Sequence, residues 1–193
     1  MRCRGVTVAV AAALAVAAAA AAFAGGASAA NGACRTNEVR AHNEIVFGHF
    51  STLAAAKKMR AKAASFAFQG VKVENEGCGD FEVEIDGADT DAVRQSVAVE
   101  ALKAGFLVTF EQTGEPLDPP HGQVVGILAS KRTVAQANAL MWQLAHANFR
   151  YIDLAYRGDR WLVVMPQVPV KSALSIAAEV SKAGFHVAFQ PAK

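Results

Sequence analysis

The chain has 193 residues, and its 19 Lys and Arg side chains barely exceed its 17 Asp and Glu side chains. This balance argues against nucleic acid as a partner, because such binding draws much of its affinity from clustered basic residues. The five His residues have no metal-binding spacing, and no nucleophile elbow, phosphate loop or dinucleotide turn is present. We therefore expect a protein that is not an enzyme and that holds no metal and no cofactor.

Residues 1–29 have the layout of a secretory signal peptide. Arg2 and Arg4 precede an apolar run over 6–24, and the small residues at 27–29 form an A-x-A cleavage signal. We expect cleavage at the end of this segment and no stable membrane span afterwards. An uncleaved membrane anchor is the alternative, since the apolar run approaches the thickness of a bilayer. The mature protein is expected to be secreted, periplasmic or associated with the cell wall.

The mature N-terminal segment, 30–43, carries one of two cysteines that remain when the signal leaves. These two cysteines are Cys34 and Cys78. An even number of cysteines in a protein expected in an oxidising compartment indicates one disulfide between them. A zinc site is the weaker interpretation, because two Cys ligands do not complete one. Loss of the signal's two arginines also leaves 17 basic against 17 acidic residues, so the mature chain is close to neutral.

The first half of the mature chain, 44–113, alternates between strand-like and helix-like segments. Ser51 and Thr52 offer N-cap oxygens to a run of strong helix formers. Strict alternation of apolar and polar residues predicts two hairpin strands, and Gly105 ends a second helix. The expected order is strand, helix, strand, strand, helix, strand, at 44–50, 53–63, 71–74, 81–86, 93–102 and 106–110.

A linker rich in Pro and Gly, 114–122, separates this half from a second half, 123–193, that repeats the order. The phrase KAGFLVTF at 103–110 returns as KAGFHVAF at 182–189 and closes each half. The elements of the second half are expected at 124–129, 133–147, 151–156, 161–165, 170–183 and 185–189.

This order predicts an α+β fold of two tandem ferredoxin-like βαββαβ units. Each unit would have an antiparallel four-stranded sheet with both helices on one face. Two interleaved halves of one larger sheet are the alternative arrangement.

Both halves carry motifs of one known family. The first half has VFGHFS at 46–51, an Ala-rich helix over 54–63 and KAGF at 103–106, and the second has VGILAS at 125–130 and KAGF at 182–185. Each half thereby resembles a sporulation-related repeat (SPOR) domain. The resemblance implies binding to peptidoglycan, in particular to glycan strands stripped of their stem peptides.

A glycan ligand requires aromatic platforms on the sheet face away from the helices, because flat rings pack on the C–H faces of sugars. The second hairpin supplies the best candidates, Trp161, Tyr151 and Tyr156. Alternation places Trp161 on the same face as Val163 and Met165. Tyr151 and Asp153 are expected to share the Trp161 face, so Trp161, Tyr151 and Asp153 are the predicted ligand-binding site. The alternative is that Trp161 belongs to the core, since large aromatic side chains are mostly buried.

Three acids at alternate positions, Glu82, Glu84 and Asp86, could be imagined as paired acids for glycoside hydrolysis. We expect instead that they form the solvated face of a strand.

The residues together predict an exported, non-enzymatic protein of the cell envelope that binds peptidoglycan glycan through its SPOR-like units. The alternative function is a protein–protein interaction module, such as an inhibitor or assembly factor, that uses an exposed sheet edge near 185–189. An enzyme ranks below both, because it would need titratable side chains that converge in a cleft.

Overall fold

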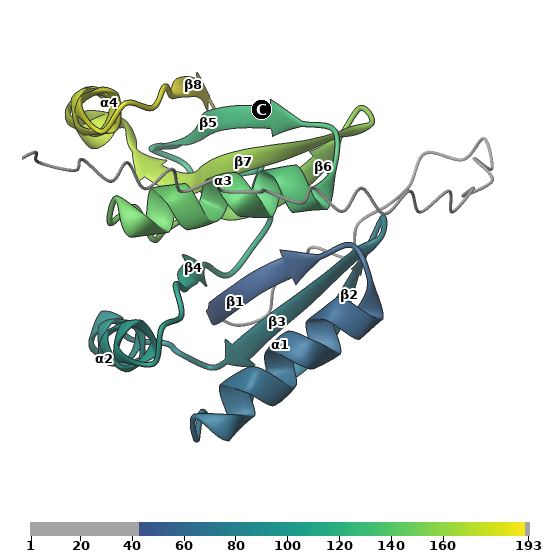
Figure 1. The fold of residues 1–193 in the computed structure, drawn as a ribbon. Helices are drawn as coiled ribbons and strands as arrows, with labels where there is room; N and C mark the ends of the chain where they lie inside the picture. Colours follow the sequence, from purple (N-terminus) through teal and green to yellow (C-terminus); the bar gives the residue numbers. More distant parts are fainter. Residues whose placement is uncertain (1–42, 192–193) are drawn as a thin grey trace, which may run out of the picture. The chain divides into compact units, whose positions relative to one another are not determined.

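A computed structural model describes residues 43–191 of the chain (Figure 1). The predicted signal peptide, Cys34 and nearly all of the mature N-terminal segment lie outside these residues, so those assignments and the Cys34–Cys78 disulfide stay predictions. Within 43–191, no helix is both long enough and apolar enough to cross a membrane.

The fold is α+β, with two four-stranded antiparallel sheets and four α-helices in the described part of the chain, as expected. The first half contains β1 (Glu44–Phe50), α1 (Leu53–Ser65), β2 (Lys72–Gly77), β3 (Asp80–Asp86), α2 (Asp91–Lys103) and β4 (Thr109–Glu111). The second half contains β5 (Gln123–Lys131), α3 (Val134–His146), β6 (Asp153–Arg157), β7 (Arg160–Pro169), a 3-10 turn (Val170–Ser172), α4 (Ala173–Lys182) and β8 (Ala188–Pro191).

The two sheets have the same topology. Their strand orders are β2-β3-β1-β4 and β6-β7-β5-β8, and every neighbouring pair of strands is antiparallel. The sheets are separate, so the alternative of one larger sheet is not the one observed. The predicted linker, 114–122, falls between β4 and β5.

Local sequence signals account for the helix ends. Thr52 is the N-cap of α1, and its side chain accepts a hydrogen bond from the Ala55 N–H. The repeated phrase ends α2 and α4 through Gly105 and Gly184, whose φ angles of 80° and 85° lie in the left-handed region that favours glycine.

The closing strands β4 and β8 begin three residues later than expected. The reason is that Phe106 and Phe185, the aromatic residues of the repeated phrase, still belong to the helix ends. Their N–H groups donate to carbonyl oxygens of the preceding helices, at 2.8 Å to Ala101 and 3.0 Å to Val180. A residue that satisfies its N–H in this way cannot also donate to the neighbouring strand.

Helix α3 packs against both sheets. It contacts β5 and β7 of its own half, and it also contacts β1 and β4 of the first half (Figure 1). The first sheet therefore has α1 and α2 on one face and the second half's α3 on the other. The core on the α1 and α2 side is aromatic, with Phe47 in edge contact with Phe68 and Phe106.

Candidate functional site

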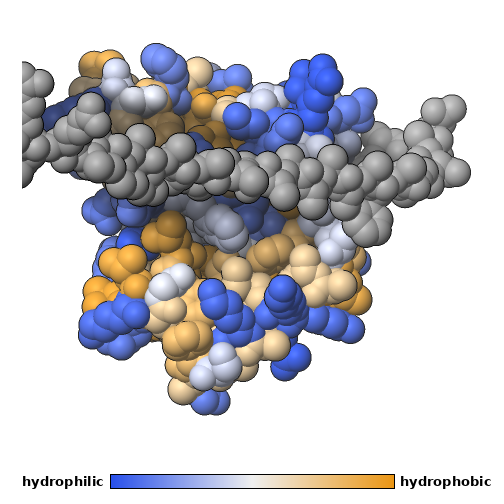
Figure 2. All heavy atoms as spheres, in the orientation of Figure 1, coloured by the Kyte–Doolittle hydropathy of each residue, from blue (hydrophilic) through white to orange (hydrophobic). Residues whose placement is uncertain are grey.

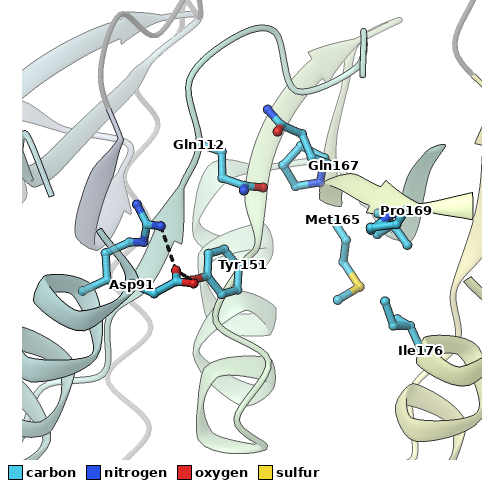
Figure 3. A pocket seen from close by; sticks show the side chains of 10 residues that line it. Asp91, Gln112, Tyr151, Met165, Gln167, Pro169 and Ile176 are labelled. Atoms are coloured by element: carbon cyan, nitrogen blue, oxygen red, sulfur yellow. Dashed lines mark hydrogen bonds and ion pairs between the residues drawn. The ribbon is translucent and has the colours of Figure 1, made fainter. Parts of the chain in front are cut away.

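A cavity of about 360 Å³ lies where residues of both halves meet (Figure 3). This volume is in the range of sites that bind small molecules. Its polar lining consists of Asp91, Arg94, Gln112, Tyr151 and Gln167. Its apolar lining consists of Met165, Pro166, Val168, Pro169 and Ile176.

Backbone contacts between β4 and the segment before β6 place Tyr151 at this cavity. The Phe110 N–H donates to the Arg150 carbonyl at 2.6 Å, and Nη1 of Arg150 donates to the Val108 carbonyl at 3.1 Å. The Tyr151 ring then packs edge-on against Phe110, with ring centroids 5.3 Å apart. The ring is thus held by the core of the first half although it belongs to the second.

Three polar side chains form a connected group on one wall of the cavity. Nη2 of Arg94 donates to Oδ1 of Asp91 at 2.8 Å, and the Tyr151 hydroxyl donates to the same oxygen (Figure 3). The hydrogen bond from Tyr151, with that from Arg94, lowers the pKa of Asp91. Burial and the bond to Asp91 raise the pKa of Tyr151. At neutral pH the wall therefore presents a carboxylate, a guanidinium and a neutral hydroxyl.

Within residues 43–191, one nitrogen of Arg94 has no hydrogen-bond partner, although the side chain is nearly buried. Its side chain is only 9% exposed, and Nη1 donates to the Ala88 carbonyl at 2.7 Å. Its Nε, by contrast, is buried and has no hydrogen-bond partner among the described residues. Buried donors are nearly always paired, so this nitrogen is an exception.

The opposite wall is apolar. Figure 3 shows Met165, Pro169 and Ile176 on the side away from Asp91, with Gln167 above them and Gln112 above Tyr151. The arrangement combines C–H surface, amides, one hydroxyl and one carboxylate, and it can bind a neutral polar molecule. Among the described residues, those that line the cavity include no His, Cys or Lys.

Of the three predicted ligand-binding residues, only Tyr151 lines the cavity. Trp161 is 3% exposed and lies in the core between the second sheet and α3, together with Leu154 of the sheet and Leu144 of the helix. Asp153 is fully buried. It pairs with Val164, whereas Leu154 pairs with Val163, so Asp153 and Trp161 lie on opposite faces of the sheet.

The expectation of a shared face for the three residues was therefore wrong. The error comes from the pairing of β6 with β7. Alternation in the sequence does not determine which residues pair, and a shift of one residue moves a side chain to the other face of the sheet. The alternative interpretation, that Trp161 belongs to the core, is the one observed.

The expectation that the acids of β3 are solvated is wrong for two of the three. Glu82 is fully buried and Glu84 is 1% exposed, whereas Asp86 is exposed. Helix α3 covers β1 on this side of the sheet and buries the two acids. Alternation within β3 cannot predict burial by a helix that belongs to the other half of the chain. Lys72 lies beside two of these acids, because its Nζ is 2.9 Å from carboxyl oxygens of both Glu84 and Asp86.

A second group of ionisable side chains surrounds His49 in the same layer. Nδ1 of His49 lies 2.9 Å from Oδ2 of Asp80, and Nε2 lies 3.3 Å from Oε1 of Glu111. Burial acts to lower the pKa of His49, but the charges of Asp80 and Glu82 outweigh it and raise this pKa well above its ordinary value. Sequence analysis missed this group, whose four members come from three strands.

No protein-family model matches the chain, and no curated protein matches it. The resemblance to SPOR domains consequently stays a prediction from motifs.

Proposed function

We propose that this chain is an exported, non-enzymatic protein of the cell envelope that binds peptidoglycan glycan in the cavity around Tyr151. The observation that carries the proposal is the composition of that cavity, whose lining combines an apolar wall with a carboxylate, a tyrosine hydroxyl and two amides. Export rests on the signal-like N-terminus, and the glycan class rests on the resemblance of both halves to SPOR domains.

We further propose that each half is a ferredoxin-like unit of the SPOR type. The strand order β2-β3-β1-β4, repeated as β6-β7-β5-β8, supports this. Additional support comes from the repeated phrase, which ends α2 and α4 in the same way and leads into the closing strand of each half.

The chemistry of an amino-sugar chain matches the two walls. Such a sugar has C–H faces and an acetamido methyl group, which pack on apolar surface such as Met165 and Ile176. Its hydroxyl groups can donate to Asp91, and its amide can pair with Gln112. A neutral ligand also agrees with the near-zero charge of the mature chain, which provides no general attraction for anions.

The first test is retention of the purified protein on sacculi before and after amidase treatment, which removes stem peptides. We expect stronger retention on treated sacculi. Replacement of Asp91 by Ala should weaken retention by at least about tenfold, because the sugar hydroxyl groups lose a charged hydrogen-bond acceptor. The matched control is Gln95→Ala, an exposed position on the same helix. Absence of retention on either form of sacculi would reject glycan as the ligand.

Protein–protein interaction is the second candidate function, favoured by exposed apolar side chains on the helices. Val99 and Leu102 of α2 are 51% and 54% exposed, and Leu174 of α4 is 85% exposed. Figure 2 shows hydrophobic surface over the part of the molecule that carries α1 and α2. Replacement of Val99 and Leu102 by Ser should leave sacculus binding unchanged if glycan is the ligand. Loss of a protein partner in the same variant would favour this second function.

A further inference from the structure

The group around His49 has the composition of a metal site. His49 is 1% exposed, and Asp80, Glu82 and Glu111 beside it are each 1% exposed or less. Imidazole and carboxylate are the ligands that Zn²⁺ and related divalent cations accept. One ligand atom from each of His49, Glu82 and Glu111 can be chosen so that all three lie within 4.8 Å of one another.

Asp80 orients the imidazole for metal binding. Its Oδ2 lies 2.9 Å from Nδ1 of His49, which is the position of a hydrogen bond from Nδ1–H to a carboxylate. In the neutral imidazole this bond puts the proton on Nδ1 and leaves a lone pair on Nε2. A carboxylate behind the histidine is the usual second partner of a histidine that binds metal.

In the neutral, metal-binding form of the ring, the lone pair on Nε2 would face a carboxylate at a distance that suits two ligands of one ion. Nε2 lies 3.3 Å from Oε1 of Glu111, and it has no hydrogen-bond partner among the described residues. Two ligand atoms that each lie about 2.0–2.1 Å from a tetrahedral ion are about 3.3 Å apart. A hydrogen bond would instead bring the atoms to about 2.9 Å.

The surrounding carboxylates also favour a cation. Oxygens of Asp80, Glu82 and Glu111 lie 2.9, 4.0 and 3.3 Å from the ring nitrogens of His49, and all four side chains are buried. Buried acids that lie this close together are stabilised by a positive charge among them, and a divalent cation would supply it.

We propose that His49, Glu82 and Glu111 bind one divalent transition-metal cation, for which Zn²⁺ is the probe, as a buried structural site. The three ligands come from β1, β3 and β4, so the metal would join three strands of the first sheet on the side covered by α3. This site is independent of the glycan cavity, and its confirmation or failure leaves the proposed function untouched.

The test is a Zn²⁺ titration of the purified chain after a chelator has stripped it, followed by calorimetry and by metal analysis of the dialysed protein. We expect one bound ion per chain and a higher melting temperature with metal. Substitution by Co²⁺ should give the visible absorption of a tetrahedral site. Absence of bound Zn²⁺ at micromolar concentrations in the wild-type chain would overturn the proposal without any variant.

Two variants locate the ion. His49→Gln and Glu111→Gln should each weaken Zn²⁺ binding by on the order of 100-fold, since even groups behind the ligands change affinity 10–100-fold. The matched control is His146→Gln, an exposed histidine at the end of α3. Circular dichroism establishes that the variants are folded. Unchanged binding in a folded His49→Gln chain, or loss of binding in His146→Gln, would place the ion elsewhere and refute the assignment.

Discussion

Replacement of Asn138 by Ala tests how firmly α3 is attached to the first sheet. Asn138 is 6% exposed, and its Oδ1 accepts a hydrogen bond of 3.0 Å from the backbone N–H of His49, 89 positions away. Gly48 makes room for this contact. Its φ is +143°, and a Cβ there would lie 3.2 Å from the same oxygen. The strand shifts its register between Val46 and Gly48, so the irregularity of β1 lies where Asn138 enters.

The expected loss follows from the burial of the donor. Without Asn138 the His49 N–H stays buried and has lost its acceptor, which costs about 1–3 kcal/mol. The removed amide leaves a small void that adds to this cost. We therefore expect the free energy of unfolding to fall by about 2 kcal/mol.

Urea denaturation followed by circular dichroism measures this change. The midpoint should fall while the m-value stays the same, because the surface exposed on unfolding is nearly unchanged. The matched control is Gln143→Ala, an exposed position on the same helix, which should stay within about 0.5 kcal/mol of wild type. A loss for Asn138→Ala no larger than that of the control would refute the reasoning.

Three further changes test the packing and the electrostatics. Burial raises the pKa of Glu84 from 4.5 to about 8, so the folded state holds a proton that the unfolded state releases. As the pH rises from 4.5 to 8, the free energy of unfolding should therefore fall by up to about 1.4 kcal/mol per pH unit. Denaturation across this range should show a flatter profile for Glu84→Gln and an unchanged one for the exposed control Glu100→Gln. Gly126→Ala would put a Cβ 2.9 Å from Cγ2 of Val187. The free energy of unfolding, measured by urea denaturation, should fall by about 1–3 kcal/mol, and an unchanged value would contradict this close packing. Trp161→Ala should lower the free energy of unfolding by about 3–5 kcal/mol. A variant that is as stable as wild type and has lost only glycan binding would contradict the assignment of Trp161 to the core.

Local sequence patterns predict the helices and strands of each half, but they do not predict where every strand begins. Thr52 marks the start of α1, and Gly105 and Gly184 mark the ends of α2 and α4. The closing strands were expected too early, because Phe106 and Phe185 look like strand residues although their N–H groups bond back to the helices.

The candidate site was predictable only in part, because it depends on contacts between segments far apart in sequence. Tyr151 was recognised as an aromatic residue available for a ligand, but its partner Asp91 lies 60 positions away. Alternation grouped Trp161 with Val163 correctly, yet it could not tell which face would meet α3. The burial of Glu82 likewise required the position of a helix from the other half.

The account's central claim is that glycan binds in the cavity around Tyr151. The most direct measurement is a map of amide chemical shifts by NMR as soluble, stem-free glycan fragments are added. We predict shifts concentrated on the cavity residues Asp91, Gln112, Tyr151 and Gln167. Absence of shifts at millimolar glycan, or shifts confined to other surfaces, would contradict the claim.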